Sequence, residues 1–142
     1  MVALRVFADQ ERSDVDPARL PRLASVRVAG ASDPLCPECE VVETTFARMR
    51  GLLGRHELPG GHGMLINPSP SVMTWFMHFP IDVVFIDREW RVVRIVDRLR
   101  PWRVAGVRHA VAALELPAGT AAAFELRVGD VLELKPVPGV SR

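Results

Sequence analysis

From Gly63 onward, the hydrophobic positions follow the pattern of short β-strands. Five segments, GMLIN, SVMTWFM, IDVVFID, RVVRIVD and HAVAALEL, are rich in β-branched and aromatic residues and are separated by turn residues. The segments at 81–87 and 91–97 form the clearest hairpin, with residues 88–90 in the connection. A last strand, VGDVLEL, follows at 128–134.

Apolar residues occupy both faces of the segment IDVVFID. Val83 and Phe85 point to one face, and Val84 and Ile86 point to the other, because successive residues of a strand alternate in direction. Neither face suits contact with water. The pattern therefore predicts a central strand that is covered on both sides.

Two short helices accompany the predicted strands. One is predicted over 45–54, where Thr44 or Thr45 caps the N-terminus and Gly54 ends the last turn. The other lies in PAGTAAAF at 117–124. Helical crossovers are missing from the pattern between residues 63 and 116, which argues against a parallel α/β fold. We expect an α+β domain that is mainly β, with a compact antiparallel sheet or a partly closed small barrel.

The beginning of the chain differs from the rest. VALRVF (2–7) and ASVRVA (24–29) are candidate strands, whereas ERSDVDP and GASDPLCPEC are rich in Pro, Asp and Ser and indicate loops. We therefore expect an N-terminal extension over 1–39, a β-rich domain over 40–136 and a tail over 137–142, forming one globular domain overall.

Composition and charge place the chain among ordinary globular domains. It has 142 residues, is 49% hydrophobic and 25% charged, and carries a net charge of +1. Such a charge gives no global field to attract nucleic acid or an anionic membrane, so we consider a nucleic-acid partner improbable but testable. The sequence contains no apolar run long enough to span a membrane and no signal-peptide pattern, so we expect a cytoplasmic protein.

Five blocks along the chain resemble domain-of-unknown-function family 192, a prokaryotic family. They are RGLLGR (50–55), TWFMHFPIDVVFID (74–87), RVVRIVDRLRPW (91–102), ELPAG (115–119) and VGD (128–130). Their order matches the family from about residue 40 to residue 134. The resemblance implies a β-rich domain with the helix at 45–54 packed on it. It implies no established activity, and no cofactor is expected.

The pair CPEC is one candidate for chemistry. Cys36 and Cys39 have the spacing of half a zinc site, but structural zinc needs four ligands and the histidines are scattered. A zinc ion would therefore require a site shared across a dimer. A redox role would favour a helix N-terminus, whereas a strand, EVV, is predicted to follow. Two inert cysteines in a loop are the simpler interpretation.

The stretch from Arg91 to Arg108 is a second candidate. It holds six arginines and a single acid, Asp97, and Trp102 lies among the arginines. Arg98, Arg100 and Arg103 surround Trp102 in a pattern typical of sites for anions or single strands. A solvated loop whose arginines pair with acids elsewhere is the alternative.

A third candidate is an apolar cleft near Trp75 and Met77, although such residues more often form part of a core. The apolar group around these two residues also includes Met64, Met73, Phe76 and Phe79. Asp82, on the face of Val84 and Ile86, either belongs to a small enzyme together with an arginine or accepts hydrogen bonds at the start of its strand. Nothing in the sequence matches a catalytic motif. The leading hypothesis is a non-catalytic binding or accessory module that takes a small apolar or anionic ligand through the cleft or the arginine-rich loop.

Overall fold

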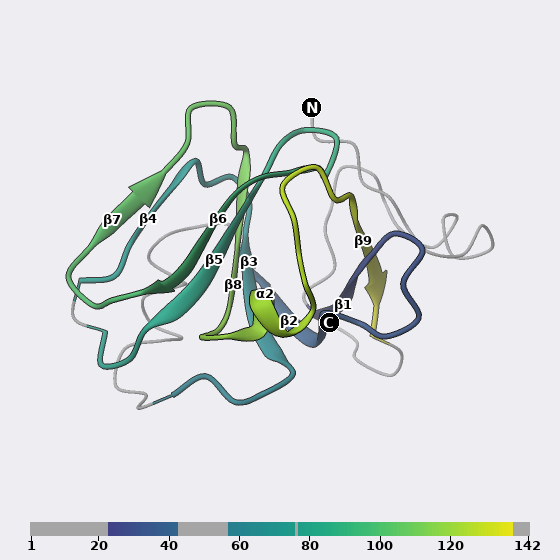
Figure 1. Ribbon diagram of the computed structural model, residues 1–142, viewed down its shortest axis with the longest axis horizontal. Helices are drawn as coiled ribbons and strands as arrows, with labels where there is room; N and C mark the ends of the chain where they lie inside the picture. The colour runs from purple at the N-terminus through teal and green to yellow at the C-terminus, as the bar shows by residue number, and fades with distance from the viewer. Residues whose placement is uncertain (1–22, 43–56, 76, 138–142) are drawn as a thin grey trace.

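A seven-stranded sheet dominates the computed structural model, which describes residues 23–42, 57–75 and 77–137 (Figure 1). In spatial order the strands are β6 (Val92–Leu99), β5 (Ile81–Ile86), β8 (Ala112–Pro117), β3 (His62–Ile66), β2 (Cys36–Val42), β1 (Leu23–Val28) and β9 (Leu132–Pro136). The hairpin predicted at 81–97 is confirmed as β5 and β6, which pair antiparallel.

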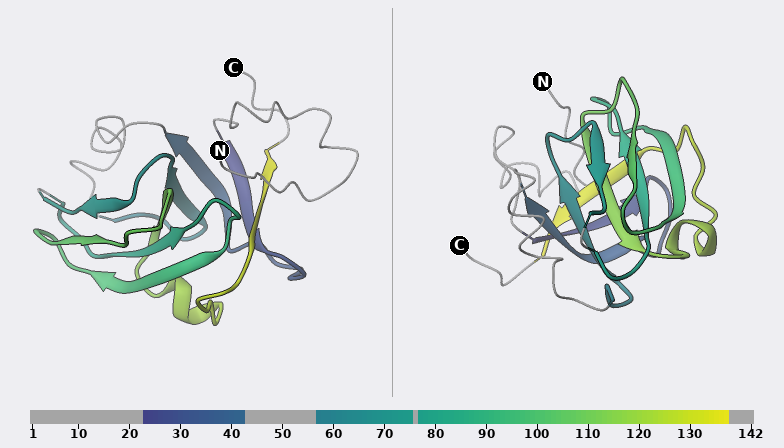
Figure 2. Two further views of the ribbon diagram at one scale, coloured as in Figure 1. Left: turned by 90° about the horizontal axis from the view of Figure 1, so that it is seen from above. Right: turned by 90° about the vertical axis from the view of Figure 1, so that its left-hand side faces the viewer.

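The sheet curls until its two outer strands, β6 and β9, come together at one end (Figure 2). An antiparallel bridge joins Arg91 to Val131, just ahead of the two strands. Beside it, the Leu132 amide donates to the Trp90 carbonyl at 2.8 Å, and the Val92 amide donates to the Asp130 carbonyl at 2.7 Å. The expected partly closed small barrel is therefore confirmed.

One pair of neighbouring strands departs from the expected antiparallel sheet. β2 and β3 run parallel, with Glu38 opposite His62 and Val42 opposite Ile66. A parallel pair needs a long crossover connection, and the chain between the two strands, residues 43–61, is long enough to provide one. Every other pairing in the sheet is antiparallel.

Apolar clusters cover both faces of the sheet. Val84 and Ile86 belong to one cluster, together with residues of β1, β2 and β9. Val83 and Phe85 belong to the other, which includes Val72 of β4 (Ser71–Met73). All six residues of β5 are buried, and the strand lies between β6 and β8. The prediction of a central strand covered on both sides is confirmed.

A two-stranded ribbon stands beside the sheet, at the left of Figure 1. It consists of β4 and β7 (Val104–Gly106), which pair antiparallel. The strand predicted for SVMTWFM is thus shorter than expected, because it ends at Met73, and β7 interrupts a stretch that we had expected to be a loop.

Of the two expected helices, the one at 117–124 is observed as α2 (Thr120–Ala123). The helix predicted over 45–54 and the strand predicted over 2–7 lie outside the described residues. Within the described part of the chain, no helix is long and apolar enough to cross a membrane.

The prediction that GASDPLCPEC forms a loop is wrong for the last four residues, CPEC. Cys36 already begins β2, and Ala24 to Val28, as expected, lie in a strand, β1. Both strands belong to the main sheet, so the boundary expected between residues 39 and 40 falls inside β2. Pro37 and the loop-like composition around it obscured this strand, because Pro is disfavoured inside sheets except at bulges.

Candidate functional site

Exposed apolar side chains gather on the outer face of the β4–β7 ribbon. Met73 lies directly opposite Val104. Beyond this pair the Thr74 amide donates to the Arg103 carbonyl at 2.9 Å. Trp75 and Trp102 lie next to this hydrogen-bonded pair, each in the turn where its segment leaves the ribbon. We call these four side chains the ribbon patch: Met73, Trp75, Trp102 and Val104 are 39%, 47%, 55% and 60% exposed.

A buried threonine holds the two tryptophan-bearing segments together. The Thr74 hydroxyl donates to the Arg100 carbonyl at 2.6 Å and accepts a hydrogen bond from the Arg103 amide at 2.9 Å. The Trp102 amide donates to the Thr74 carbonyl at 3.0 Å. Trp102 has a φ of 65°, a conformation that such a tight network has to impose on a bulky residue. The patch is therefore presented on a stiff scaffold.

The arginines of the predicted basic stretch disperse instead of converging. Arg94 donates to the Gly106 carbonyl at 2.6 Å and so ties β6 to the ribbon. Arg91 donates to the Gly129 carbonyl at 3.4 Å, close to the point where β6 and β9 meet. These side chains are used to hold the fold together.

Three further arginines had been grouped with Trp102. The Arg98 guanidinium lies beside Gly119. A Cβ atom placed on Gly119 would stand 3.1 Å from Nη2 of Arg98. Arg103 donates to the Trp102 carbonyl at 3.3 Å. Arg100 and Arg103 are both exposed and lie in the segment that enters β7, so they border the ribbon patch.

The apolar residues proposed for a cleft are split between surface and core. Trp75 faces solvent, whereas Met77 is buried in the apolar cluster beneath the ribbon. Phe79 and Met64 belong to the same buried cluster. Trp75 and Met77 therefore do not line a common surface.

Asp82 is fully buried, and both of its carboxylate oxygens accept backbone hydrogen bonds. Oδ1 accepts from the Arg98 amide at 2.9 Å. Oδ2 accepts from the Gly119 amide at 3.0 Å and from the Ala121 amide at 2.9 Å. The carboxylate thus joins β5 to the end of β6 and to the start of α2. This arrangement matches the structural role weighed for Asp82 and leaves no oxygen facing a substrate.

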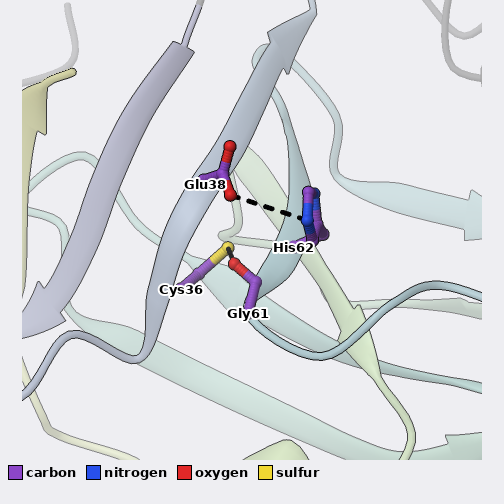
Figure 3. Close-up of polar contacts among 4 residues, drawn as sticks. All are labelled: Cys36, Glu38, Gly61 and His62. Atoms are coloured by element: carbon purple, nitrogen blue, oxygen red, sulfur yellow. Dashed lines mark hydrogen bonds and ion pairs between the residues drawn. The ribbon is translucent and has the colours of Figure 1, made fainter. Parts of the chain in front are cut away.

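The two cysteines lie on β2. Figure 3 shows Cys36 beside the turn that leads into β3. The Cys36 thiol lies 3.7 Å from the Gly61 carbonyl oxygen. Above it, Glu38 and His62 approach to 3.6 Å at the surface. Among the residues that the structure describes, no three His, Cys, Asp or Glu side chains gather as metal ligands would.

The Cys39 thiol is held in its protonated form. A hydrogen bond with Cys36 is the largest cause that raises the pKa of Cys39 well above its usual range, and burial is the next. Electrostatic repulsion from Cys36 and Glu40 adds to the rise in the pKa of Cys39, because like charges disfavour ionisation.

Sequence reasoning considered Met73 only as lining for an apolar cleft, and it missed Val104 as a member of a surface site. The signal was present in the alternation of Met73 with Trp75 and of Trp102 with Val104. The sequence does not show that these two segments, which lie far apart in the chain, pair with each other; only the fold shows this.

Comparisons with known proteins agree with the fold. The family model DUF192, an uncharacterized ACR, matches residues 26–134 and therefore includes the cysteine pair, which had been expected to lie outside the shared region. None of the curated proteins matches the chain.

Two solved structures resemble it. A protein of unknown function from Novosphingobium aromaticivorans DSM 12444 is 25% identical, with a TM-score of 0.68, over 84% of this chain and 90% of that one. A candidate transcription regulator from Sinorhizobium meliloti 1021 is 25% identical, with a TM-score of 0.67, over 82% of this chain and 97% of that one.

Proposed function

The chain belongs to the uncharacterised family DUF192, and from that premise we propose that it is a non-catalytic module that binds a protein partner through the ribbon patch. The observation that carries the proposal is the exposure of Trp75 and Trp102 in the two turns that adjoin the hydrogen-bonded Thr74–Arg103 pair, beside the exposed Met73 and Val104. Tryptophan is the residue type most often found among the few side chains that dominate binding energy. Large apolar side chains that cluster on a surface commonly mark an interaction site.

The charge around the patch indicates the chemistry of the partner. The two ribbon segments, 71–75 and 100–106, contain Arg100 and Arg103 and no acidic residue. Trp, Met and Arg are enriched at protein interfaces, whereas Lys and Glu are depleted. A segment with apolar side chains between acidic ones would place its apolar groups on the patch and its carboxylates beside the two guanidinium groups.

A single-stranded nucleic acid is a less suitable occupant. Affinity for phosphates grows with the number of basic groups that neutralise them. Arg91 and Arg94 are already hydrogen-bonded to the backbone carbonyls of Gly129 and Gly106, and the net charge of the chain is +1. Because one similar solved structure is described as a candidate transcription regulator, the test also includes nucleic acid as a possible occupant.

Binding can be measured with a library of short peptides that carry Leu and Phe between Asp and Glu. Intrinsic fluorescence reports on the patch, because Trp75 and Trp102 are exposed while the third tryptophan, Trp90, is buried. We expect peptides from this library to bind and the same peptides with Lys in place of the acids to bind weakly. A mixed-sequence single strand and a polyphosphate are measured alongside at two salt concentrations.

Matched variants separate the patch from general surface hydrophobicity. Trp75→Ser with Trp102→Asn removes both rings, and Asn tolerates the positive φ at the second position. Phe124→Ser removes an apolar side chain of similar exposure, 43%, outside the ribbon. We expect the double variant to weaken peptide binding by about 30-fold or more, since the loss of one such residue alone costs about 2 kcal/mol or more. Binding of all variants is followed by the fluorescence anisotropy of a dye-labelled peptide, because the double variant lacks both reporting tryptophans. Equal binding by the double variant, or binding of the single strand in place of the peptides, would refute the proposal.

A further inference from the structure

A β-bulge brings Cys36 and Cys39 onto the same face of β2. In a regular strand, residues three positions apart point to opposite faces. Here Cys39 lies opposite Ala24, and Cys36 lies opposite Val26, so three steps along β2 match two steps along β1. The extra residue of a bulge reverses the alternation. Both thiols therefore enter the same apolar cluster, where both are fully buried.

The bulge also shortens the distance between the two cysteines. Three steps along a regular strand span about 10 Å, and two steps span about 6.6 Å. Because the partners on β1 are two steps apart, the Cα atoms of Cys36 and Cys39 are held about 6.6 Å apart. Disulfides join Cα atoms about 4.4–6.8 Å apart, so the pair lies at the upper end of that range.

We propose that Cys36 and Cys39 form a redox-active dithiol that closes reversibly into a disulfide across the bulge in β2. A hydroperoxide is the oxidant, because its reacting oxygens are small enough to reach a buried sulfur. The Cys36 sulfur attacks one oxygen of hydrogen peroxide, the O–O bond breaks, and Cys36 becomes a sulfenic acid while water is released. The Cys39 sulfur then attacks the Cys36 sulfur, the S–O bond breaks, and the departing hydroxide takes the Cys39 proton. Two thiols and one peroxide give one disulfide and two waters.

The surroundings assign the two roles. The Cys36 sulfur, although buried, borders the carbonyl of Gly61 in an exposed turn (Figure 3), and its chain neighbours Pro37 and Glu38 are exposed, so we assign Cys36 the attack on the peroxide. Cys39 keeps its proton and is the resolving thiol, since only a thiolate attacks peroxide readily.

Gly63 leaves the room that the Cys36 sulfur occupies. A Cβ atom at this position of β3 would stand 2.7 Å from Cys36 Sγ and 2.8 Å from the Glu115 carbonyl oxygen. Any larger residue would displace the sulfur or the neighbouring strand. The absence of a side chain here is what allows a thiol to lie between β2 and β3.

The test uses the 142-residue chain, which contains 2 cysteines, Cys36 and Cys39. Folded protein is treated with millimolar hydrogen peroxide, unreacted thiols are alkylated after denaturation, and the peptide containing residues 36–39 is analysed by mass spectrometry. We expect a loss of two hydrogen masses on this peptide, no alkylation, and full recovery of both thiols with dithiothreitol. Because only the peptide that contains the two cysteines is analysed, oxidation of methionines elsewhere in the chain does not affect the measurement.

A register control tests the geometry itself. Glu38→Cys combined with Cys39→Ala retains two cysteines but moves one of them to the exposed side of the bulge. We expect this variant to form at least tenfold less intramolecular disulfide than the natural chain under the same treatment. Cys39→Ser should halt at a sulfenic acid on Cys36, trapped with dimedone.

Two results would overturn the proposal. One is a natural chain whose thiols both remain alkylatable or are oxidised to sulfinic acid without a disulfide. The other is a register control that closes as readily as the natural chain. Either result would leave the cysteines as apolar residues of the core.

Discussion

Replacing Asp82 by asparagine tests whether this buried carboxylate holds three elements together. The two oxygens of the carboxylate, which lies on β5, accept three amide hydrogen bonds, one from the end of β6 and two from the N-cap and first turn of α2. An asparagine has only one acceptor oxygen. Its favoured orientation turns that oxygen toward Gly119 and Ala121, and its NH₂ group then faces the Arg98 amide, which is also a donor.

The size of the expected destabilisation follows from the hydrogen bonds that Asp82→Asn removes or weakens. One buried donor left without an acceptor costs about 1–3 kcal/mol. The two remaining hydrogen bonds lose the assistance of a charge, which makes such bonds roughly twice as strong as neutral ones. Removing a buried charge recovers part of this cost. We expect Asp82→Asn to lower the free energy of unfolding by about 2–4 kcal/mol, a large share of the 5–15 kcal/mol typical of a domain.

Asp87 provides a matched control. It also accepts two backbone hydrogen bonds, from the Glu89 amide at 2.8 Å and the Arg91 amide at 3.0 Å, but both go to the same oxygen, Oδ1. An asparagine can supply that oxygen, and the site is partly exposed. We expect Asp87→Asn to cost less than about 1 kcal/mol in urea denaturation. If Asp82→Asn costs no more than Asp87→Asn, the carboxylate does not have the structural role assigned to it.

Three further outcomes are expected. Val84→Ala and Phe85→Ala should each lower the free energy of unfolding by about 2–4 kcal/mol, because each opens a cavity in one of the two clusters, and a near-neutral result for both in chemical denaturation would contradict the central strand. The raised pKa of Cys39 means that the folded state holds a proton that the unfolded state releases above about pH 8.5, so stability should fall as the pH rises through that region, and comparison of urea midpoints should show that Cys39→Ala removes this fall. Elemental analysis of protein purified without chelator should find well under one zinc per chain, whereas one zinc per two chains, lost when Cys36 and Cys39 are changed to Ser, would establish a dimer-spanning site.

The parts of the fold that could be predicted from sequence are those whose signal is local. The hairpin of β5 and β6 carries its strand pattern and its turn within a single segment of chain, and the apolar residues on both faces of β5 indicate burial without reference to any partner. The short helix α2 is equally local, since PAGTAAAF combines a turn with helix-forming alanines.

The parts that could not be predicted depend on pairing between distant segments. The parallel alignment of β2 with β3 joins residues on either side of a long crossover, and no local pattern specifies it. Trp90 illustrates the same limit: it falls in a hairpin connection, where solvent exposure is expected, but it is buried and lies where β6 meets β9. Its burial depends on the closure of the barrel.

The proposed binding surface and the proposed dithiol should act independently, because they belong to opposite sides of the sheet. The inner face of the ribbon packs, through Val72 and Ala105, on one apolar cluster, while Cys36 and Cys39 point into the other. Energetic coupling between separated sites requires a shared element with two alternative arrangements, and β5, buried on both faces, is packed too tightly to provide one. We therefore expect oxidised and reduced protein to bind the acidic peptides with affinities within twofold of each other, measured by tryptophan fluorescence. A larger difference would show that closing the disulfide moves the sheet as a whole, and the sheet could not then be treated as a rigid partition between the two sites.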